Sequence, residues 1–356
     1  MKALRNITLI AFAAAMVFAA IVGSQNTAAQ TEPAKKPAVP TPTPPIDEEE
    51  GVIKIDTEAV NVLFTAQDKD RRLLLTLKPA DFQIFENGQL QQVSAFSRQV
   101  DLPLSLAILI DTSMSQERTL PEEKMAAMSF LESVVRPEKD EVSVISFTGD
   151  ATLEQGMTSN IARLRRAIEA VRLSPQMGYI GGGVVMGTPG INPNSASGAT
   201  AVWDAIWVTS EEILGPAPEK TRRAIILLSD GVNTYGKKKL NEAVEAAQRA
   251  EAVIYCIGIG DNFTSGVDRG SLNKVAERTG GRAYFPRDEA DLRKAFQQIQ
   301  DEMRSQYLVS YEPTNAALDG SYRTIEMKLV NPELQKEKVQ LTHRKGYFAK
   351  KPEKKK

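Results

Sequence analysis

The chain has 356 residues and carries 44 Lys and Arg against 45 Asp and Glu, which gives a formal net charge of −1. This balance excludes a general nucleic-acid binder, which needs a surplus of basic groups to displace counterions from phosphates. Hydrophobic residues make up 42% and charged residues 25% of the chain, as in ordinary globular proteins, so global disorder is excluded. One cysteine, Cys256, and one histidine, His343, allow no internal disulfide and leave too few ligands for a Cys/His zinc site.

The first residues have the pattern of an export signal. Lys2 and Arg5 precede an apolar run, Ile7–Val22, and small residues follow. This order is typical of a secretory signal peptide, so we expect cleavage after Ala29, which makes residues 1–29 the signal. The apolar run is also almost long enough for a membrane span of about 20 residues, and an uncleaved N-terminal membrane anchor is the alternative. In both cases we predict an exported protein, periplasmic or secreted.

Two segments are too polar for a folded core. Residues 30–50 form a Pro-rich linker, because the stretch from Thr31 to Glu50 holds six prolines in twenty positions and ends in acidic residues. Residues 350–356 read KKPEKKK and are interpreted as a solvated basic tail.

Short alternating segments on both flanks indicate antiparallel strands. They occur in residues 51–101 and return in residues 305–349. The pair Asn87-Gly88 supplies the positive φ angles that a tight hairpin needs. Each flank is too short for a good sandwich by itself. We therefore expect strands of the N- and C-terminal flanks to pair into one small β module.

The middle of the chain, residues 102–304, alternates two kinds of pattern. Four near-continuous apolar runs are typical of strands covered on both faces: Leu104–Ile110, Glu141–Phe147, Arg222–Ser229 and Ala252–Gly260. Helical patterns are found at Leu120–Val135, Asn160–Val171, Thr200–Leu214, Leu240–Ala250 and Ala290–Arg304. This alternation predicts a doubly wound, mostly parallel α/β sheet. Ala151–Met157 follows a strand too closely for a crossover and should be antiparallel.

Oxygen-bearing side chains follow two of these runs and open a helix. Asp111, Ser113 and Ser115 come after the first run, Asp230 comes after Arg222–Ser229, and Thr200 opens the central helical pattern. Ligands of open parallel sheets collect outside the carboxyl ends of the strands. Hard divalent cations such as Mg²⁺ prefer oxygen ligands, so this set predicts a magnesium-type site.

The order Asp-x-Ser-x-Ser, then Thr, then Asp-Gly resembles the metal-ion-dependent adhesion site of von Willebrand factor type A domains. The resemblance covers roughly Leu102 to Arg304. With ADFQIFENGQLQQVSAFS ahead and HRKGYF behind, the chain is similar to the VWFA-related group of bacterial exported proteins. The resemblance implies a sheet in which the strands that lead to Asp111 and Asp230 are neighbours.

It also implies the role of each residue. Ser113 and Ser115 would coordinate the metal directly, Asp111 and Asp230 would act largely through bound water, and Thr200 would bind directly or through water. The ion would be Mg²⁺, with Mn²⁺ or Ca²⁺ as alternatives. A cation with few anionic ligands keeps an electrophilic open position, which an Asp or Glu carboxylate of a protein partner can fill. The Gly- and Pro-rich segment 174–199 delivers Thr200 and should border this ligand face.

These features favour a non-enzymatic, metal-dependent protein-binding module, used for adhesion or as a scaffold in the bacterial envelope or exterior. One alternative is an accessory subunit of an envelope complex. Another is a Mg²⁺-dependent phosphoryl-transfer enzyme with Asp111 as nucleophile, although Ser113 stands where such enzymes commonly have a second acid. We expect Asp111 to face solvent, so that Asp111→Ala abolishes partner capture and leaves the fold intact. The sequence does not identify the partner or the oligomeric state.

Other residues near the predicted site have plainer interpretations. Asp204 either orients the site or occupies a solvated helix position. Trp203 and Trp207 are interpreted as core-facing or half-buried aromatics on one helix side. Asp261 and Asn262 are interpreted as a loop cap. We expect a structural role for His343.

Overall fold

The computed structural model describes residues 59–98, 101–173, 200–218, 221–260 and 266–351. All of them belong to one compact unit, Ile53–Lys356. The predicted signal peptide, Pro-rich linker, segment 174–199, loop cap at Asp261 and Asn262, and most of the basic tail lie outside the described residues. None of the helices in the described ranges is both long and apolar enough to span a membrane.

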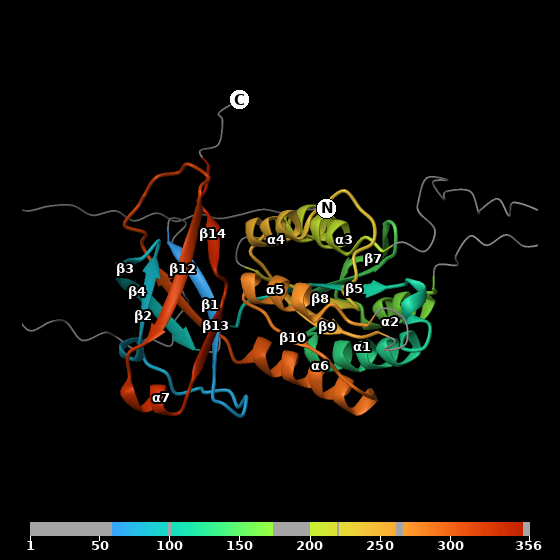
Figure 1. The fold of residues 1–356 in the computed structure, drawn as a ribbon, viewed down its shortest axis with the longest axis horizontal. Coiled ribbons are helices and arrows are strands. Elements are labelled where there is room, and N and C mark those ends of the chain that lie inside the picture. The colour runs from blue at the N-terminus through green and yellow to red at the C-terminus, as the bar shows by residue number, and fades with distance from the viewer. Residues whose placement is uncertain (1–58, 99–100, 174–199, 219–220, 261–265, 352–356) are drawn as a thin grey trace, which may run out of the picture. The chain divides into compact units, whose positions relative to one another are not determined.

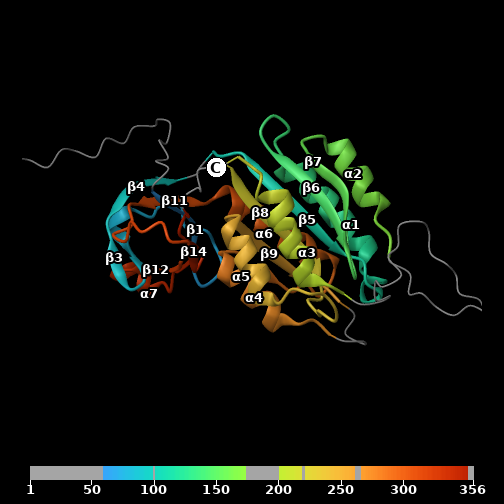
Figure 2. The ribbon, with the colours of Figure 1, turned by 90° about the horizontal axis from the view of Figure 1, so that it is seen from above.

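A six-stranded sheet forms the centre of the molecule (Figures 1 and 2), in the order β10-β9-β8-β5-β6-β7. Its strands are β5 Leu104–Asp111, β6 Glu141–Phe147, β7 Ala151–Thr158, β8 Arg222–Ser229, β9 Ala252–Gly258 and β10 Ala283–Tyr284. All neighbours are parallel except β6 and β7, which are antiparallel as predicted. Every residue of β5 is buried, because both faces of the sheet are covered.

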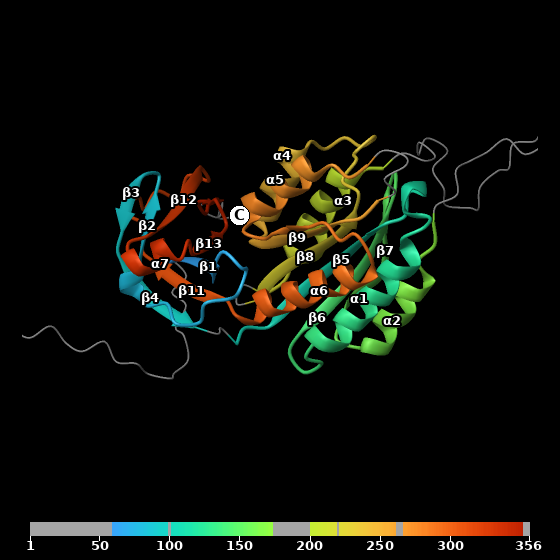
Figure 3. The same cartoon turned by 60° about the horizontal axis from the view of Figure 1, so that its bottom comes forward.

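Helices cover the two faces (Figure 3): α1, α2 and α6 share one apolar core with the sheet, and α3, α4 and α5 share the other. Their bounds are α1 Leu120–Val134, α2 Ile161–Ala170, α3 Val202–Val208, α4 Leu240–Arg249, α5 Arg269–Thr279 and α6 Glu289–Arg304, with the π-helix η3 Thr209–Leu214 continuing α3. The short 3₁₀ turn η2 spans Met114–Gln116. This is the predicted doubly wound α/β fold; α5 is the one long helix of the described residues that the sequence analysis did not predict.

The flanks pair into a β module of two four-stranded sheets, ordered β13-β1-β11-β4 and β14-β12-β2-β3. Their elements are β1 Val60–Gln67, η1 Pro79–Asp81, β2 Phe82–Glu86, β3 Gln89–Gln91, β4 Val93–Arg98, β11 Tyr307–Tyr311, β12 Tyr322–Leu329, α7 Pro332–Lys336, β13 Gln340–His343 and β14 Gly346–Phe348. The predicted pairing of N- and C-terminal strands is therefore confirmed. Asn87 and Gly88 turn the β2–β3 hairpin with φ angles of 48° and 80°.

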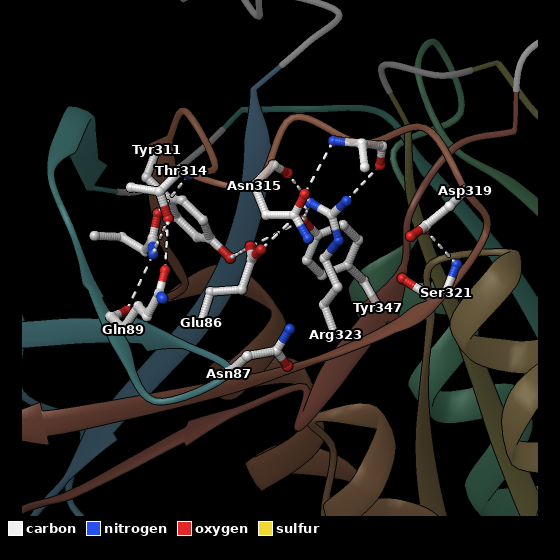
Figure 4. A network of polar contacts seen from close by, with 12 residues as sticks. Glu86, Asn87, Gln89, Tyr311, Thr314, Asn315, Asp319, Ser321, Arg323 and Tyr347 are labelled. Carbon is white, nitrogen blue, oxygen red and sulfur yellow. Dashed lines mark hydrogen bonds and ion pairs between the residues drawn. The ribbon is translucent and has the colours of Figure 1, made fainter.

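A buried ion pair stiffens the β module (Figure 4). Glu86 and Arg323 are each 2% exposed, and Glu86 also accepts hydrogen bonds of 2.9 Å from the hydroxyls of Tyr311 and Tyr347. Arg323 donates in addition to the carbonyls of Asn315 and Ala317. Such partners offset the desolvation of a buried pair, so this network fixes the loop between β11 and β12.

A second polar cluster joins the β module to the α/β domain. One carboxylate oxygen of Glu302, on α6, accepts hydrogen bonds from Gln67 of β1 at 2.9 Å, from Arg282 Nε at 3.0 Å and from the Tyr284 hydroxyl at 2.8 Å. Glu302 is only 2% exposed, so these three donors replace the water that its carboxylate would otherwise bind. The two parts of the unit are thus held together by specific, directional contacts.

Candidate metal site

The predicted site lies at the carboxyl ends of β5 and β8. These strands are parallel neighbours, with Ile110 opposite Leu228, so Asp111 and Ser229 leave the sheet side by side. The Ser229 hydroxyl donates a hydrogen bond of 2.6 Å to Asp111 Oδ2. The topology therefore places the loop of Asp111 beside the loop of Asp230, as the resemblance implied.

The hydroxyl-bearing loop after β5 folds around Asp111. Asp111 Oδ1 accepts a hydrogen bond of 2.9 Å from the Ser113 amide, and the hydroxyls of Ser113 and Ser115 are 2.9 Å apart. The Ser115 side chain also lies near enough to Asp230 to lower the pKa of its carboxyl group. Hydrogen bonds thus connect Asp111, Ser113 and Ser115, and Ser115 brings this loop beside Asp230.

Thr200 contacts the loop that follows Asp230 through its backbone. Its amide donates to the Thr234 hydroxyl at 2.8 Å, and its carbonyl accepts from the amides of Thr234 at 3.0 Å and Tyr235 at 3.1 Å. The next residue, Ala201, donates to the carbonyl of Thr148, which follows β6. The start of the α3 segment is thereby fixed between the loop after β6 and the loop after Asp230.

Burial changes the acidity of both aspartates. Asp111 is 0% exposed, and burial, reinforced by the nearby Asp230, raises its pKa to about 6. Burial also raises the pKa of Asp230, which is 3% exposed, with a further contribution from Asp268. The expectation that Asp111 faces solvent was wrong. Asp111→Ala would leave Ser229 and the Ser113 amide without their acceptor, so this substitution costs stability as well as any binding function.

Asp204 anchors the loop that follows Asp230. Its carboxylate accepts hydrogen bonds from the amides of Lys237 at 3.0 Å and Lys238 at 3.1 Å. Gly236 lies between Asp204 and these amides with a φ of +111°, and a Cβ there would come 2.1 Å from Asp204 Oδ2. Of the two interpretations of Asp204, orientation of the site loops is therefore the one that its contacts support.

The two tryptophans have the predicted structural roles. Trp203 is 7% exposed and packs in the core shared by α3 and the sheet. Trp207 is half-buried, and the ammonium of Lys238 lies 4.0 Å from the centre of its ring.

Two buried polar residues near the site escaped the sequence analysis. Gln116 is 0% exposed; its amide nitrogen donates to the Ile259 carbonyl at 3.1 Å and more weakly to the Ser115 hydroxyl at 3.4 Å. Glu123 of α1 is also 0% exposed. The sequence did contain a signal for the burial of Glu123. Glu123, Ala127 and Leu131 follow one another at intervals of four residues and lie on the apolar stripe of α1.

The donor set fits a hard divalent cation. Within the described ranges, no three His, Cys, Asp or Glu side chains gather closely enough to hold a metal ion by themselves. A cation at this edge of the sheet would therefore need the hydroxyls of Ser113 and Ser115 beside the carboxylates. An all-oxygen set of this kind suits Mg²⁺, Mn²⁺ or Ca²⁺ better than softer metals.

Comparison with protein families identifies the α/β domain. Two family models, each described as von Willebrand factor type A domain, match residues 190–299 and 106–233. The chain belongs to the von Willebrand factor type A domain family. Both matches lie inside the predicted range 102–304. A comparison with curated proteins gave no match.

Solved structures with this fold include mussel and bacterial proteins. Proximal thread matrix protein 1 from the mussel byssus, with a zinc-occupied MIDAS motif, is 19% identical over 61% of this chain and 49% of its own, with a TM-score of 0.46. BatB from Bacteroides thetaiotaomicron is 20% identical over 57% of this chain and all of its own, with a TM-score of 0.41. The chain spans about half the length of the mussel proteins it matches. Identities and TM-scores this low leave function unassigned.

Proposed function

We propose that the protein is a metal-dependent protein-binding module, in which Asp111, Ser113, Ser115, Thr200 and Asp230 hold a Mg²⁺-type ion that captures an Asp or Glu carboxylate of a partner. The observation that carries the proposal is the set of hydrogen bonds that connects Asp111, Ser113 and Ser115 at the edge of the sheet where Asp230 follows the neighbouring strand β8. The match to the type A family supports it.

The contacts of Asp111 explain how a cation at this site would keep its affinity for an external carboxylate. Both of its oxygens accept hydrogen bonds, from Ser229 and from the Ser113 amide, and the side chain is fully buried. The neutral hydroxyls of Ser113 and Ser115 are then the more accessible ligands. Neutral ligands leave much of the charge of a divalent ion uncompensated, so an external carboxylate is a favourable additional ligand.

The same contacts disfavour the phosphoryl-transfer alternative. A nucleophilic carboxylate needs an oxygen that can approach phosphorus, whereas both oxygens of Asp111 are buried and hydrogen-bonded. Cys256 and His343, two other side chains suited to covalent or acid–base chemistry, are also buried. Burial raises the pKa of the Cys256 thiol and lowers the pKa of His343 to about 4. A binding role is therefore the better supported function.

We place this module in the bacterial envelope or exterior. The support is the sequence pattern of residues 1–29, which has the basic start and apolar run of an export signal. Adhesion, scaffolding and service as an accessory subunit share the same site chemistry. A surface-attachment defect in a deletion strain would select adhesion, and stable co-purification with one envelope complex would select the subunit role.

Ion binding by the purified chain tests the site directly. Calorimetric titration with Mn²⁺ should show binding by the wild type, and Ser113→Ala with Ser115→Ala should weaken it at least about tenfold, because both hydroxyl ligands are gone. The matched control is Ser129→Ala, which removes an exposed hydroxyl from α1. Equal affinity in the double variant and the control would contradict the proposed ligands.

Capture of a partner tests the function. An envelope protein that is retained by the immobilised chain in Mg²⁺ and released by a chelator fits the proposal, provided that a neutralised acidic residue in that protein also abolishes retention. Equal retention with and without the chelator would reject a metal bridge. Phosphatase turnover of a generic phosphate ester by the metal-loaded chain would favour the enzyme instead.

A further inference from the structure

Glu123 is a buried carboxyl group without a hydrogen-bond partner. It is 0% exposed, and neither of its carboxylate oxygens has a hydrogen-bond partner among the described residues. The Thr119 hydroxyl lies beside it but donates to Gln116 Oε1 at 3.0 Å. An ionised carboxylate in such surroundings is strongly destabilised, so a native protein that keeps one there requires a compensating charge or a bound proton.

The charged groups with the largest effect on Glu123 are acidic. They are Asp111 at the end of β5, Asp230 after β8, and Glu122 on its own helix. The helices α2 and α6 pack on α1 through apolar residues such as Ile168 and Phe296. The carboxyl groups of Asp111, Asp230 and Glu123 therefore interact electrostatically with one another.

We propose that Glu123 is a positioning residue of the cation site, which acts on the ion through its charge without coordinating it, so that binding of a divalent cation expels a proton from its carboxyl group. This inference rests on the proposed function. In the metal-free protein the Glu123 carboxyl group holds a proton. When the cation enters, that proton passes to solvent, and the carboxylate that remains contributes to neutralising the ion.

The electrostatics of the buried cluster support this exchange. Burial, with smaller contributions from Asp111 and Asp230, raises the pKa of Glu123 to about 8, so the carboxyl group is mostly protonated at neutral pH when no cation is bound. A nearby divalent charge acts in the opposite direction, and its effect is strong because water is excluded. The affinity for the cation therefore rises with pH, as the Glu123 proton becomes easier to release.

The test is calorimetry of Mn²⁺ binding to the full chain in a series of buffers that differ in ionisation enthalpy, at pH 7.5. At this pH Asp111, with a pKa of about 6, is already ionised, so its contribution is small. The wild type should release roughly half to one proton per Mn²⁺, and its affinity should rise several-fold between about pH 6.5 and 8. Glu123→Gln should release fewer protons and bind Mn²⁺ with little pH dependence in this interval.

Two comparisons distinguish an electrostatic role of Glu123 from a purely structural one. Glu122→Gln removes the same charge from an exposed position one residue earlier; because Glu122 acts on Glu123 less than Asp111 and Asp230 do, it should change proton release and affinity far less than Glu123→Gln. Glu123→Gln resembles the protonated carboxyl group, so its affinity should match the wild type near pH 6.5 and fall below it by about tenfold near pH 8.5. A purely structural role would instead lower affinity by the same factor at every pH.

Each outcome has a definite meaning. Equal proton release by the wild type and Glu123→Gln would overturn the inference while the metal site stands. If Glu123→Gln does not fold, Glu123→Met supplies an uncharged side chain suited to an apolar site, and the wild-type buffer series is decisive by itself: Mn²⁺ binding without proton release overturns the inference. Absence of Mn²⁺ binding by the wild type would overturn the proposed function as well.

Discussion

Ser229 and Asp111 are joined across two neighbouring strands by a hydrogen bond of 2.6 Å between the serine hydroxyl and Asp111 Oδ2. The bond lies where β8 and β5 leave the sheet, and both residues are 0% exposed. It fixes the orientation of a carboxylate of the proposed metal site, but it does not remove the cost of burying that charge. The stability of the metal-free protein should therefore depend on the ionisation of Asp111.

This dependence has a definite sign. The pKa of Asp111 is raised from 3.8 to about 6 in the folded protein, so the folded state holds the proton more tightly than the unfolded chain. The stabilisation is fully present below about pH 4 and is lost as the pH rises through about 6. In a chelator, the wild type should lose on the order of 3 kcal/mol relative to Asp111→Asn between pH 4 and 7, because the amide does not titrate.

Urea unfolding of both proteins at several pH values, with a chelator present, measures this difference. An excess of Mg²⁺ should reduce the loss for the wild type alone, since a bound cation favours the ionised carboxylate. A difference between the two proteins that stays constant from pH 4 to 7 would contradict the buried, titrating Asp111.

Glu302 should be one of the costliest acidic residues to remove. Glu302→Ala leaves Gln67, Arg282 and Tyr284 without their shared acceptor between α6 and β1. Removal of one partner from a buried charged network costs about 3–5 kcal/mol, which should appear as a lower urea midpoint. The control is Glu289→Ala on the same helix, whose ion pair with Arg293 is exposed and should contribute less than about 1 kcal/mol. Similar losses in both variants would show that the cluster does not join the two parts.

Gly236 should be far less replaceable than Gly88, although both have positive φ angles. At Gly88, with φ +80°, a Cβ has nothing within 4 Å, so Gly88→Ala carries only the backbone cost of about 1–2 kcal/mol. At Gly236, the Cβ displaces Asp204 from the Lys237 and Lys238 amides. Gly236→Ala should therefore lower the unfolding free energy further and also weaken Mn²⁺ binding, because the loop after Asp230 loses its anchor. Unfolding and Mn²⁺ titration of both variants test this; equal effects on both measurements would refute the anchoring role.

The fold was predictable where one physical requirement dominates. Continuous apolar runs such as Leu104–Ile110 identified the buried parallel strands, and Asn87-Gly88 identified the hairpin, because few other structures tolerate those patterns. The helix α5 was missed although Asp268 caps its start and Gly280, with φ 90°, ends it. Its buried stripe contains few large apolar residues, so composition alone gave a weak signal.

The juxtaposition of Asp111 and Asp230 was predictable, whereas their burial was not. Asp111 and Asp230 lie close together because their strands, β5 and β8, are neighbours in the sheet, and the resemblance implied this strand order. Their burial depends on how neighbouring loops close over them, which local sequence does not encode. Glu123 lies on the apolar stripe of α1, which indicated burial, whereas its charge and its neighbour Glu122 indicated a solvated helix turn; the packing of α1 on the sheet decides between the two.

The pairing of β1 with β11 has a consequence for folding during synthesis. Asn61 faces Ser310 across this pair, 249 residues apart in the chain. During synthesis, β1 lacks its hydrogen-bonding partner until the entire type A domain and then β11 have been made. A chain that stopped between α6 and β11 would carry β1 without its partner strand and would be prone to aggregate by edge-to-edge association.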